Sequence, residues 1–196
     1  MQQRLTGMLI GAVFGTVFVV VNANSPLDAT AGAILRGAAV LGLAGVVVMW
    51  FLAVRRIKTG AVRAAGPDTT GPGAAGRFFG LRYAFIVAAE AVLLFGGIAV
   101  LRVWERPEQT NVAWIAFVVG VHFVALAPVW GQRSILVVGV VLALLGTAGL
   151  IMAATSAVAW VPFVSGVLSG AVLLAGSLTF ARQELAAPAA QDRTAS

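Results

Sequence analysis

The sequence predicts an all-α integral membrane protein, a bundle of six transmembrane helices with the N-terminus and the C-terminus both cytoplasmic. Three observations predict this fold class. The composition is too apolar for a water-soluble domain, six apolar runs are long enough to cross a bilayer, and the basic residues gather in alternate loops.

The composition indicates that lipid is the solvent of this chain. Hydrophobic residues make up 60% of the 196 residues and charged residues 10%, whereas a soluble domain has about 25% charged residues. The mean hydropathy is +0.99. The chain has no cysteine and a single histidine, so a disulfide or a thiolate metal site is excluded and a zinc site is disfavoured. We expect no metal and no cofactor.

The six apolar runs are each long enough to cross a hydrocarbon core of about 30 Å at about 1.5 Å per residue. In that core the backbone must satisfy its own hydrogen bonds, which favours helices. We expect residues 1–182 to form one transmembrane domain, with spans at about 5–21, 31–54, 78–101, 112–130, 134–154 and 157–180.

Two polar segments are expected on the same side of the membrane as the two termini. Residues 55–77 are rich in Gly, Pro and Arg, a composition with too few apolar residues to form a core, so we expect a flexible cytoplasmic loop. Residues 183–196 are Ala-rich and polar, and we expect a disordered C-terminal tail.

The loop charges predict the orientation. With a cytoplasmic N-terminus, the inner segments carry Arg4, Arg55, Arg56, Lys58, Arg63, Arg77, Arg133, Arg182 and Arg193, and the outer loops carry only Arg102 and Arg106, offset by Glu105 and Glu108. This is the positive-inside pattern. The net charge of +6 therefore reflects topology, and we expect the lipid bilayer, and no nucleic acid, as the partner. A protein partner or a homo-oligomer stays open, and so does the alternative that the first run is a cleaved signal peptide.

Ionisable side chains within the spans are the candidates for a functional site, because they are costly in lipid. Glu90 and His122 lie at similar depth on neighbouring antiparallel spans, so the two side chains can meet near the midplane. Arg36, in the second span, is the third candidate. One interpretation is a proton relay or a ligand-binding pair, with Arg36 as a counter-ion. The other is a structural hydrogen bond between helices, with Arg36 extended toward the interface.

Small residues at four-residue spacing predict close helix packing. They form a ridge on the first span and two pairs on the sixth: Gly7, Gly11 and Gly15, then Ser165, Gly166, Ser169 and Gly170. Tryptophans near the span ends suit the headgroup level, namely Trp50, Trp104, Trp114, Trp130 and Trp160.

The segments "RYAFIVAAEAVLLF" and "VAWIAFVVGVHFVALA" resemble a group of uncharacterised bacterial multi-pass membrane proteins. Their fourth span reads G-[LV]-H-F-x-x-L-A, which matches Gly120, Val121, His122, Phe123, Leu126 and Ala127. The group often has proline before the Leu-Ala pair, whereas this chain has Ala125 there. The resemblance covers about a third of the chain. It implies a multi-pass topology and adds no activity.

Two classes of function fit these features. The favoured one is a non-catalytic accessory or interaction protein of the bacterial plasma membrane with an intramembrane polar pair. The alternative is a small-solute or proton-coupled permease that uses Glu90 and His122. An enzyme is disfavoured, because none of the common nucleotide-binding, zinc-protease or serine-hydrolase motifs is present.

Overall fold

The computed structural model describes residues 2–63, 81–131 and 133–191, and all of its regular elements are helical. The long helices are α1 (Gln2–Asn22), α2 (Ala29–Arg63), α4 (Leu81–Val103), α5 (Gln109–Trp130), α6 (Arg133–Met152) and α7 (Leu168–Gln191). A 3-10 helix, η1 (Ser156–Trp160), and a π-helix, η2 (Pro162–Val167), precede α7. No strand occurs within these ranges. The prediction of an all-α fold is confirmed.

Five stretches of the described chain are long and apolar enough to cross a membrane. They are Ala29–Arg55, Ala84–Val103, Gln109–Val129, Arg133–Met152 and Ser156–Gln183. The apolar part of α1, Gly7–Asn22, is shorter. The helices are thus those of a multi-pass membrane protein, while a sixth crossing and the orientation stay predictions.

Two helices continue into segments for which the sequence predicted no structure. Helix α2 runs to Arg63, so the first part of the segment 55–77 is helical. Helix α7 runs to Gln191, so residues 183–191 are helical and not a disordered tail. Arg, Lys, Gln, Glu and Ala are good helix formers, so leaving the apolar region is no reason for these helices to end. Residues 64–77 and 192–196 lie outside the described part of the chain.

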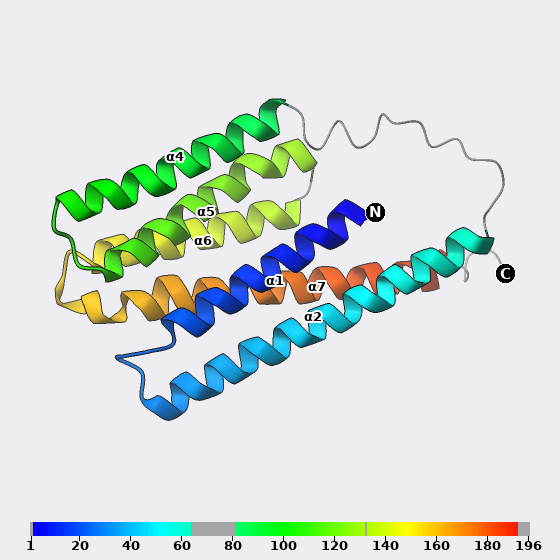
Figure 1. Cartoon of the computed structure of the whole chain (residues 1–196), viewed down its shortest axis with the longest axis horizontal. Coiled ribbons are helices and arrows are strands. Elements are labelled where there is room, and N and C mark those ends of the chain that lie inside the picture. Colours follow the sequence, from blue (N-terminus) through cyan, green and yellow to red (C-terminus); the bar gives the residue numbers. More distant parts are fainter. Residues whose placement is uncertain (1, 64–80, 132, 192–196) are drawn as a thin grey trace.

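The helices form two groups of three (Figure 1). Helices α1, α2 and α7 pack against one another, and α5 packs along α6 in the most extensive contact of the fold. Helix α7 and η2 also contact α6, which joins the two groups. Helix α4 packs against α5 and makes no comparable contact with any other described element. It therefore occupies an edge of the bundle.

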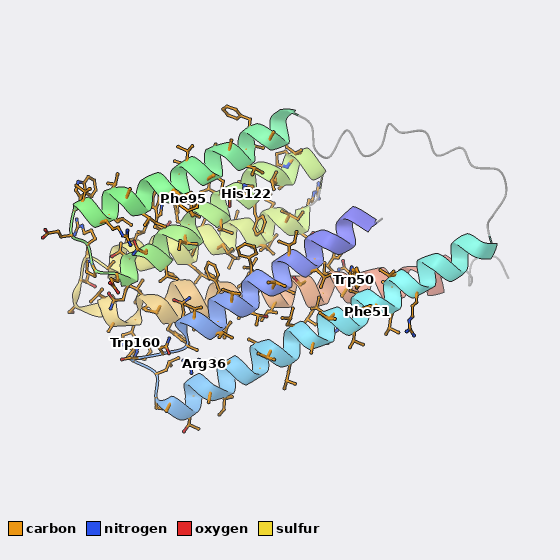
Figure 2. The ribbon with its side chains drawn as sticks, viewed as in Figure 1. Arg36, Trp50, Phe51, Phe95, His122 and Trp160 are labelled. Carbon is orange, nitrogen blue, oxygen red and sulfur yellow. The ribbon has the colours of Figure 1, made fainter. Side chains whose placement is uncertain are left out.

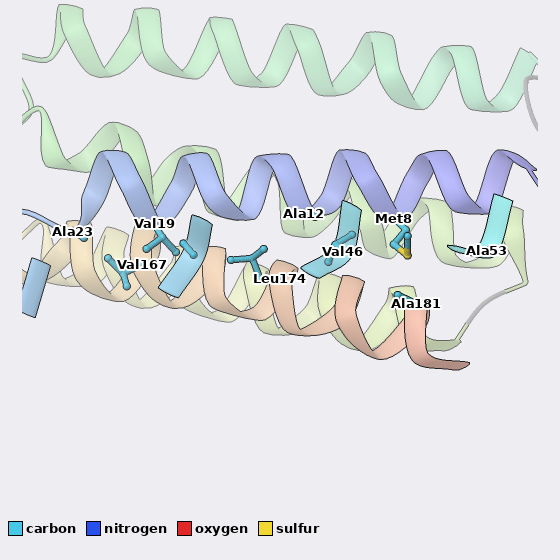
Figure 3. Packing of buried hydrophobic residues seen from close by; sticks show 10 residues of the cluster. Met8, Ala12, Val19, Ala23, Val46, Ala53, Val167, Leu174 and Ala181 are labelled. Atoms are coloured by element: carbon cyan, nitrogen blue, oxygen red, sulfur yellow. The ribbon is translucent and has the colours of Figure 1, made fainter. Parts of the chain in front are cut away.

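The main apolar cluster lies among α1, α2 and α7 (Figure 3). Its buried members are mostly small: Met8, Ala12, Val19, Ala23, Ala39, Val46, Ala53, Val167, Leu174 and Ala181. Larger side chains point away from the bundle on every helix, and Leu41, Phe85 and Val92 are more than 70% exposed. This distribution suits a protein whose outer surface faces lipid.

Glycine allows α5 and α6 to approach to backbone contact. A Cβ atom at Gly120 of α5 would overlap the backbone of Ala143 and lie 2.8 Å from the carbonyl oxygen of Gly139. A Cβ at Gly139 of α6 would in turn lie 2.8 Å from the backbone nitrogen of Val124. Because backbone atoms cannot move aside as a flexible side chain can, both positions require glycine.

We predict that Gly120→Ala destabilises the protein by about 1–3 kcal/mol, because the added methyl group forces α5 and α6 apart. The matched control is Gly96→Ala on α4, where an added Cβ meets nothing within 4 Å. That change should leave stability unchanged or raise it slightly, since alanine is the better helix former. Denaturant unfolding in detergent micelles measures both, and equal effects of the two changes would contradict the close contact.

Candidate functional site

The structure brings Glu90 and His122 together across the contact between α4 and α5. Nδ1 of His122 lies 3.0 Å from Oε2 of Glu90. Glu90 is thirteen residues before the last residue of α4, Val103, and His122 is thirteen residues after the first residue of α5, Gln109. In antiparallel neighbours joined by a short loop, equal offsets place two side chains at equal depth. Figure 2 shows His122 on α5, beside α4.

The two groups are close in distance but not aligned as a linear hydrogen bond. Nδ1 of His122 has no partner that meets hydrogen-bond geometry among the described residues. We regard the 3.0 Å separation as the defining feature, because a modest rotation of the carboxyl group would direct it at the imidazole. A carboxyl group and an imidazole at this distance can hold one proton between them, either as an ion pair or as two neutral groups.

The pair is not sealed inside the bundle. The side chain of Glu90 is 24% exposed and that of His122 is 11% exposed. Glu90 comes from the helix at the edge of the fold, because α4 has α5 as its main neighbour. The outer side of α4 carries large apolar side chains such as Phe85, Val92 and Phe95, which are at least 70% exposed. The carboxyl group thus lies between an apolar outer surface and a single supporting helix.

Arg36 does not join this pair. Its guanidinium group donates to the carbonyl oxygens of Val20 and Ala23, at 3.2 Å and 2.7 Å, and to the side-chain oxygen of Asn24. These acceptors are at the C-terminal end of α1 and just beyond it, where the last carbonyls of a helix lack intrahelical partners and attract a cation. Arg36 therefore holds the α1–α2 hairpin, as its position near the turn of that hairpin in Figure 2 also shows.

A second polar contact between α4 and α5 was not anticipated from the sequence. Nε1 of Trp114 donates to the carbonyl oxygen of Leu93 at 3.1 Å, and the indole occupies the space that a side chain at Gly97 would need. Trp114 thus packs against α4, and its level relative to the headgroups stays a prediction. Gly97 and Trp114 lie six and five residues from the ends of their helices at the shared loop, so the matching-depth argument could have paired them too.

The small residues chosen from the sequence differ in what they contact. Gly15 and Gly170 pack α1 against α7, since a Cβ at Gly15 would lie 2.8 Å from the carbonyl oxygen of Gly170. Gly11 faces Ser177, Gly166 faces the side chain of Asn22, and Gly7 has no neighbour within 4 Å of an added Cβ.

The two serines of this set are fully buried. Ser165 donates to the carbonyl oxygen of Leu145 at 2.9 Å and so connects η2 to α6. The hydroxyl of Ser169 has no partner among the described residues.

In comparisons with known proteins, no family model, no curated protein and no solved structure matches the chain. No group of three or more potential metal-ligating side chains occurs in the described ranges either. The geometry of the α4–α5 contact is therefore the main basis for a functional interpretation.

We predict a favourable coupling between Glu90 and His122 of about 0.6 kcal/mol, and no more than about 1.7 kcal/mol, the range of measured hydrogen bonds between transmembrane helices. The experiment is a double-mutant cycle with Glu90→Ala and His122→Phe, followed by unfolding in micelles. The double change should cost less than the two single costs added, because the second change removes a group that the first left unsatisfied.

The control cycle combines Glu90→Ala with Thr147→Val. Thr147 bonds the carbonyl oxygen of Ala143 within its own helix, α6, and shares no partner with Glu90, so these two costs should add. Additivity in the first cycle as well would show that the two groups do not interact.

Proposed function

We propose that this chain is a non-catalytic accessory or interaction protein of the bacterial plasma membrane. In this proposal the Glu90–His122 pair holds α4 at the edge of the bundle, and the outer face of α4 contacts lipid or another transmembrane segment. The observation that carries the proposal is the position of the pair, which lies in the contact of two adjacent helices at the edge of the fold.

The edge position fits a packing role better than a transport role. Substrate and ion sites of secondary transporters lie near the midplane where repeats meet and several helices contribute. Here Arg36 would have supplied a third charged group, but it is bound to the end of α1 in the other group of helices. Hydrogen bonds between polar side chains of two helices contribute to the association of transmembrane helices, which is the role that a pair between α4 and α5 can fill.

Four residues of the G-V-H-F-x-x-L-A segment have a physical role in this arrangement. Gly120 allows the close approach of α6, His122 meets Glu90 of α4, and Leu126 and Ala127 are buried. The segment therefore combines the features that keep α5 between its two neighbours. The proposal therefore includes the resemblance to bacterial multi-pass membrane proteins that have the same pattern.

One observation favours the alternative of a proton-coupled permease. The carboxyl group of Glu90 is partly exposed and can hold a proton together with His122, as a relay would require. The two functions differ in a measurable flux. The purified full-length chain is reconstituted in vesicles that enclose a pH-sensitive dye, and a potassium gradient with valinomycin drives proton entry.

We predict that vesicles with the wild-type chain and vesicles with Glu90→Gln acidify at the same rate as protein-free vesicles. Because the flux assay reports function only on a folded protein, the melting temperature of each preparation serves as the control. A proton flux that the wild-type chain provides and Glu90→Gln abolishes would overturn the accessory role and support the permease.

The loop charges support a topology of six crossings with both termini cytoplasmic. Since the chain has no cysteine, single cysteines placed at Thr69 and at Gln109 can be labelled with a membrane-impermeant maleimide. We predict that Gln109→Cys labels in intact cells and that Thr69→Cys labels only after the cells are opened. Labelling of both from the same side would contradict the topology.

A further inference from the structure

The Glu90–His122 pair lies well inside the apolar stretches of its two helices. Glu90 is six residues after Ala84, the start of the stretch on α4, and His122 is seven residues before Val129, the end of the stretch on α5. At about 1.5 Å per residue, both are about 9 Å or more from the nearer end. Lipid tails cannot solvate an ion, so a net charge on the pair at this depth costs free energy.

The net charge of the pair depends on how many protons it holds besides the hydrogen that a neutral imidazole always carries. Nδ1 of His122 lies 3.0 Å from Oε2 of Glu90. One proton makes the pair neutral, whether that proton resides on the carboxyl group or on the imidazole. Without it the pair carries one negative charge, and with a second proton it carries one positive charge. Only the state with one proton therefore suits an apolar surrounding.

On the helices that surround the pair, no other charge lies close enough to replace that proton. Helix α4 packs against α5, and α5 packs against α6, η1 and η2. Both η1 and η2 lack ionisable residues. Gly139 of α6 lies opposite residues 120–124 of α5 and so marks the level of the pair on α6. The other ionisable residues of α4, α5 and α6 are at least six residues along a helix from that level, about 9 Å: Arg82, Tyr83, Arg102 and Arg133.

We infer that the Glu90–His122 pair is a proton-binding site whose occupancy is coupled to the attachment of α4. The pair takes up one proton from water as α4 and α5 come together, and the net charge of the two groups changes from −1 to 0. This coupling rests on the proposed role of the pair in holding α4, and it makes that attachment responsive to pH. Because α4 has α5 as its main neighbour, a loss of the proton acts on the contact that holds this helix in place.

The direction of the pH response follows from the two groups when they are apart. In a separated, water-exposed state a glutamate has a pKa of about 4.3 and a histidine a pKa of about 6.5. Between these values the separated groups together hold one proton, as the pair does, so the contact does not respond to pH. Above about pH 6.5 they hold none, so the contact takes up a proton as it forms and weakens about tenfold for each pH unit. Acidification from about pH 8 to about pH 6.5 therefore strengthens the attachment of α4.

Trp114 provides a local probe of this contact, because its indole donates to the carbonyl oxygen of Leu93 and packs against Gly97 of α4. The other four of the five tryptophans are changed to phenylalanine in the full-length chain, so that the fluorescence reports Trp114 alone. Equilibrium unfolding in detergent micelles is followed from about pH 5 to about pH 8, a range that brackets the ordinary pKa of histidine. The reference is the double variant Glu90→Gln with His122→Phe, in which neither position titrates.

We expect the ratio of the wild-type folding constant to the reference folding constant to stay the same between about pH 5 and 6, and to fall about tenfold between about pH 7 and 8. The single variant His122→Phe should fall about tenfold in both intervals, because a separated glutamate without the imidazole has already lost its proton above about pH 4.3. The difference between the two curves below pH 6 is the signature of the imidazole.

A wild-type ratio that stays constant up to about pH 8 would overturn the inference, because the folded pair would then lose its proton as readily as the separated groups do. A wild-type ratio that already falls between about pH 5 and 6 would also overturn it, because the folded pair would then hold two protons. If the ratio is constant but the double-mutant cycle of Glu90 and His122 still shows a favourable coupling, the pair holds α4 without proton uptake, and only the inference fails. An absence of coupling at every pH would remove the basis of the accessory role as well.

Discussion

Close backbone approach is the constraint on which most of this fold depends. Lipid tails are as apolar as leucine, so burying apolar surface does not drive transmembrane helices together as it does in water. What remains is van der Waals contact, and its density depends on how near two helix backbones can come. The chain places Gly120 and Gly139 where α5 meets α6, and Gly15 and Gly170 where α1 meets α7. Many of the largest side chains lie on the outer surface, where lipid provides the apolar contacts that another helix would otherwise provide.

Helix α4 shows what happens where that packing is weaker. Gly96 has open space around it. Gly97 packs against the indole ring of Trp114, whereas the glycines between α5 and α6 pack against the backbone of the facing helix. Two polar contacts hold α4 on α5: the pair of Glu90 with His122, and the bond from Trp114 to the carbonyl oxygen of Leu93. A helix attached in this way to one main neighbour suits a surface that meets another membrane component. It suits less well a wall around a transport path, which several helices must close.

The sequence predicted those features of the fold and site that depend on periodicity and depth. Apolar run length located the helices, and equal distance from a shared loop placed Glu90 opposite His122. Of the two interpretations of Arg36, the role as a counter-ion of the pair does not fit, because its partners include backbone carbonyls at the end of α1. The type of side chain in a sequence does not reveal an unpaired carbonyl. The ends of α2 and α7 were misplaced because a drop in hydropathy marks the end of the apolar region and not the end of a helix. The division of the sixth span into η1, η2 and α7 has no clear signal beyond Pro162.

The central claim is that α4 is an edge helix, with lipid on its outer side and Glu90 facing α5 and no aqueous cavity. Spin labels at single cysteines along residues 85–100, one at a time, test this claim most directly through their collision rates with oxygen and with a water-soluble nickel chelate. The account predicts high oxygen access at the exposed positions Phe85, Val92 and Phe95, a minimum at Gly97 on the side of α5, and no nickel access near Glu90. Strong nickel access at positions 90 and 94 would show water reaching the pair and would contradict the account.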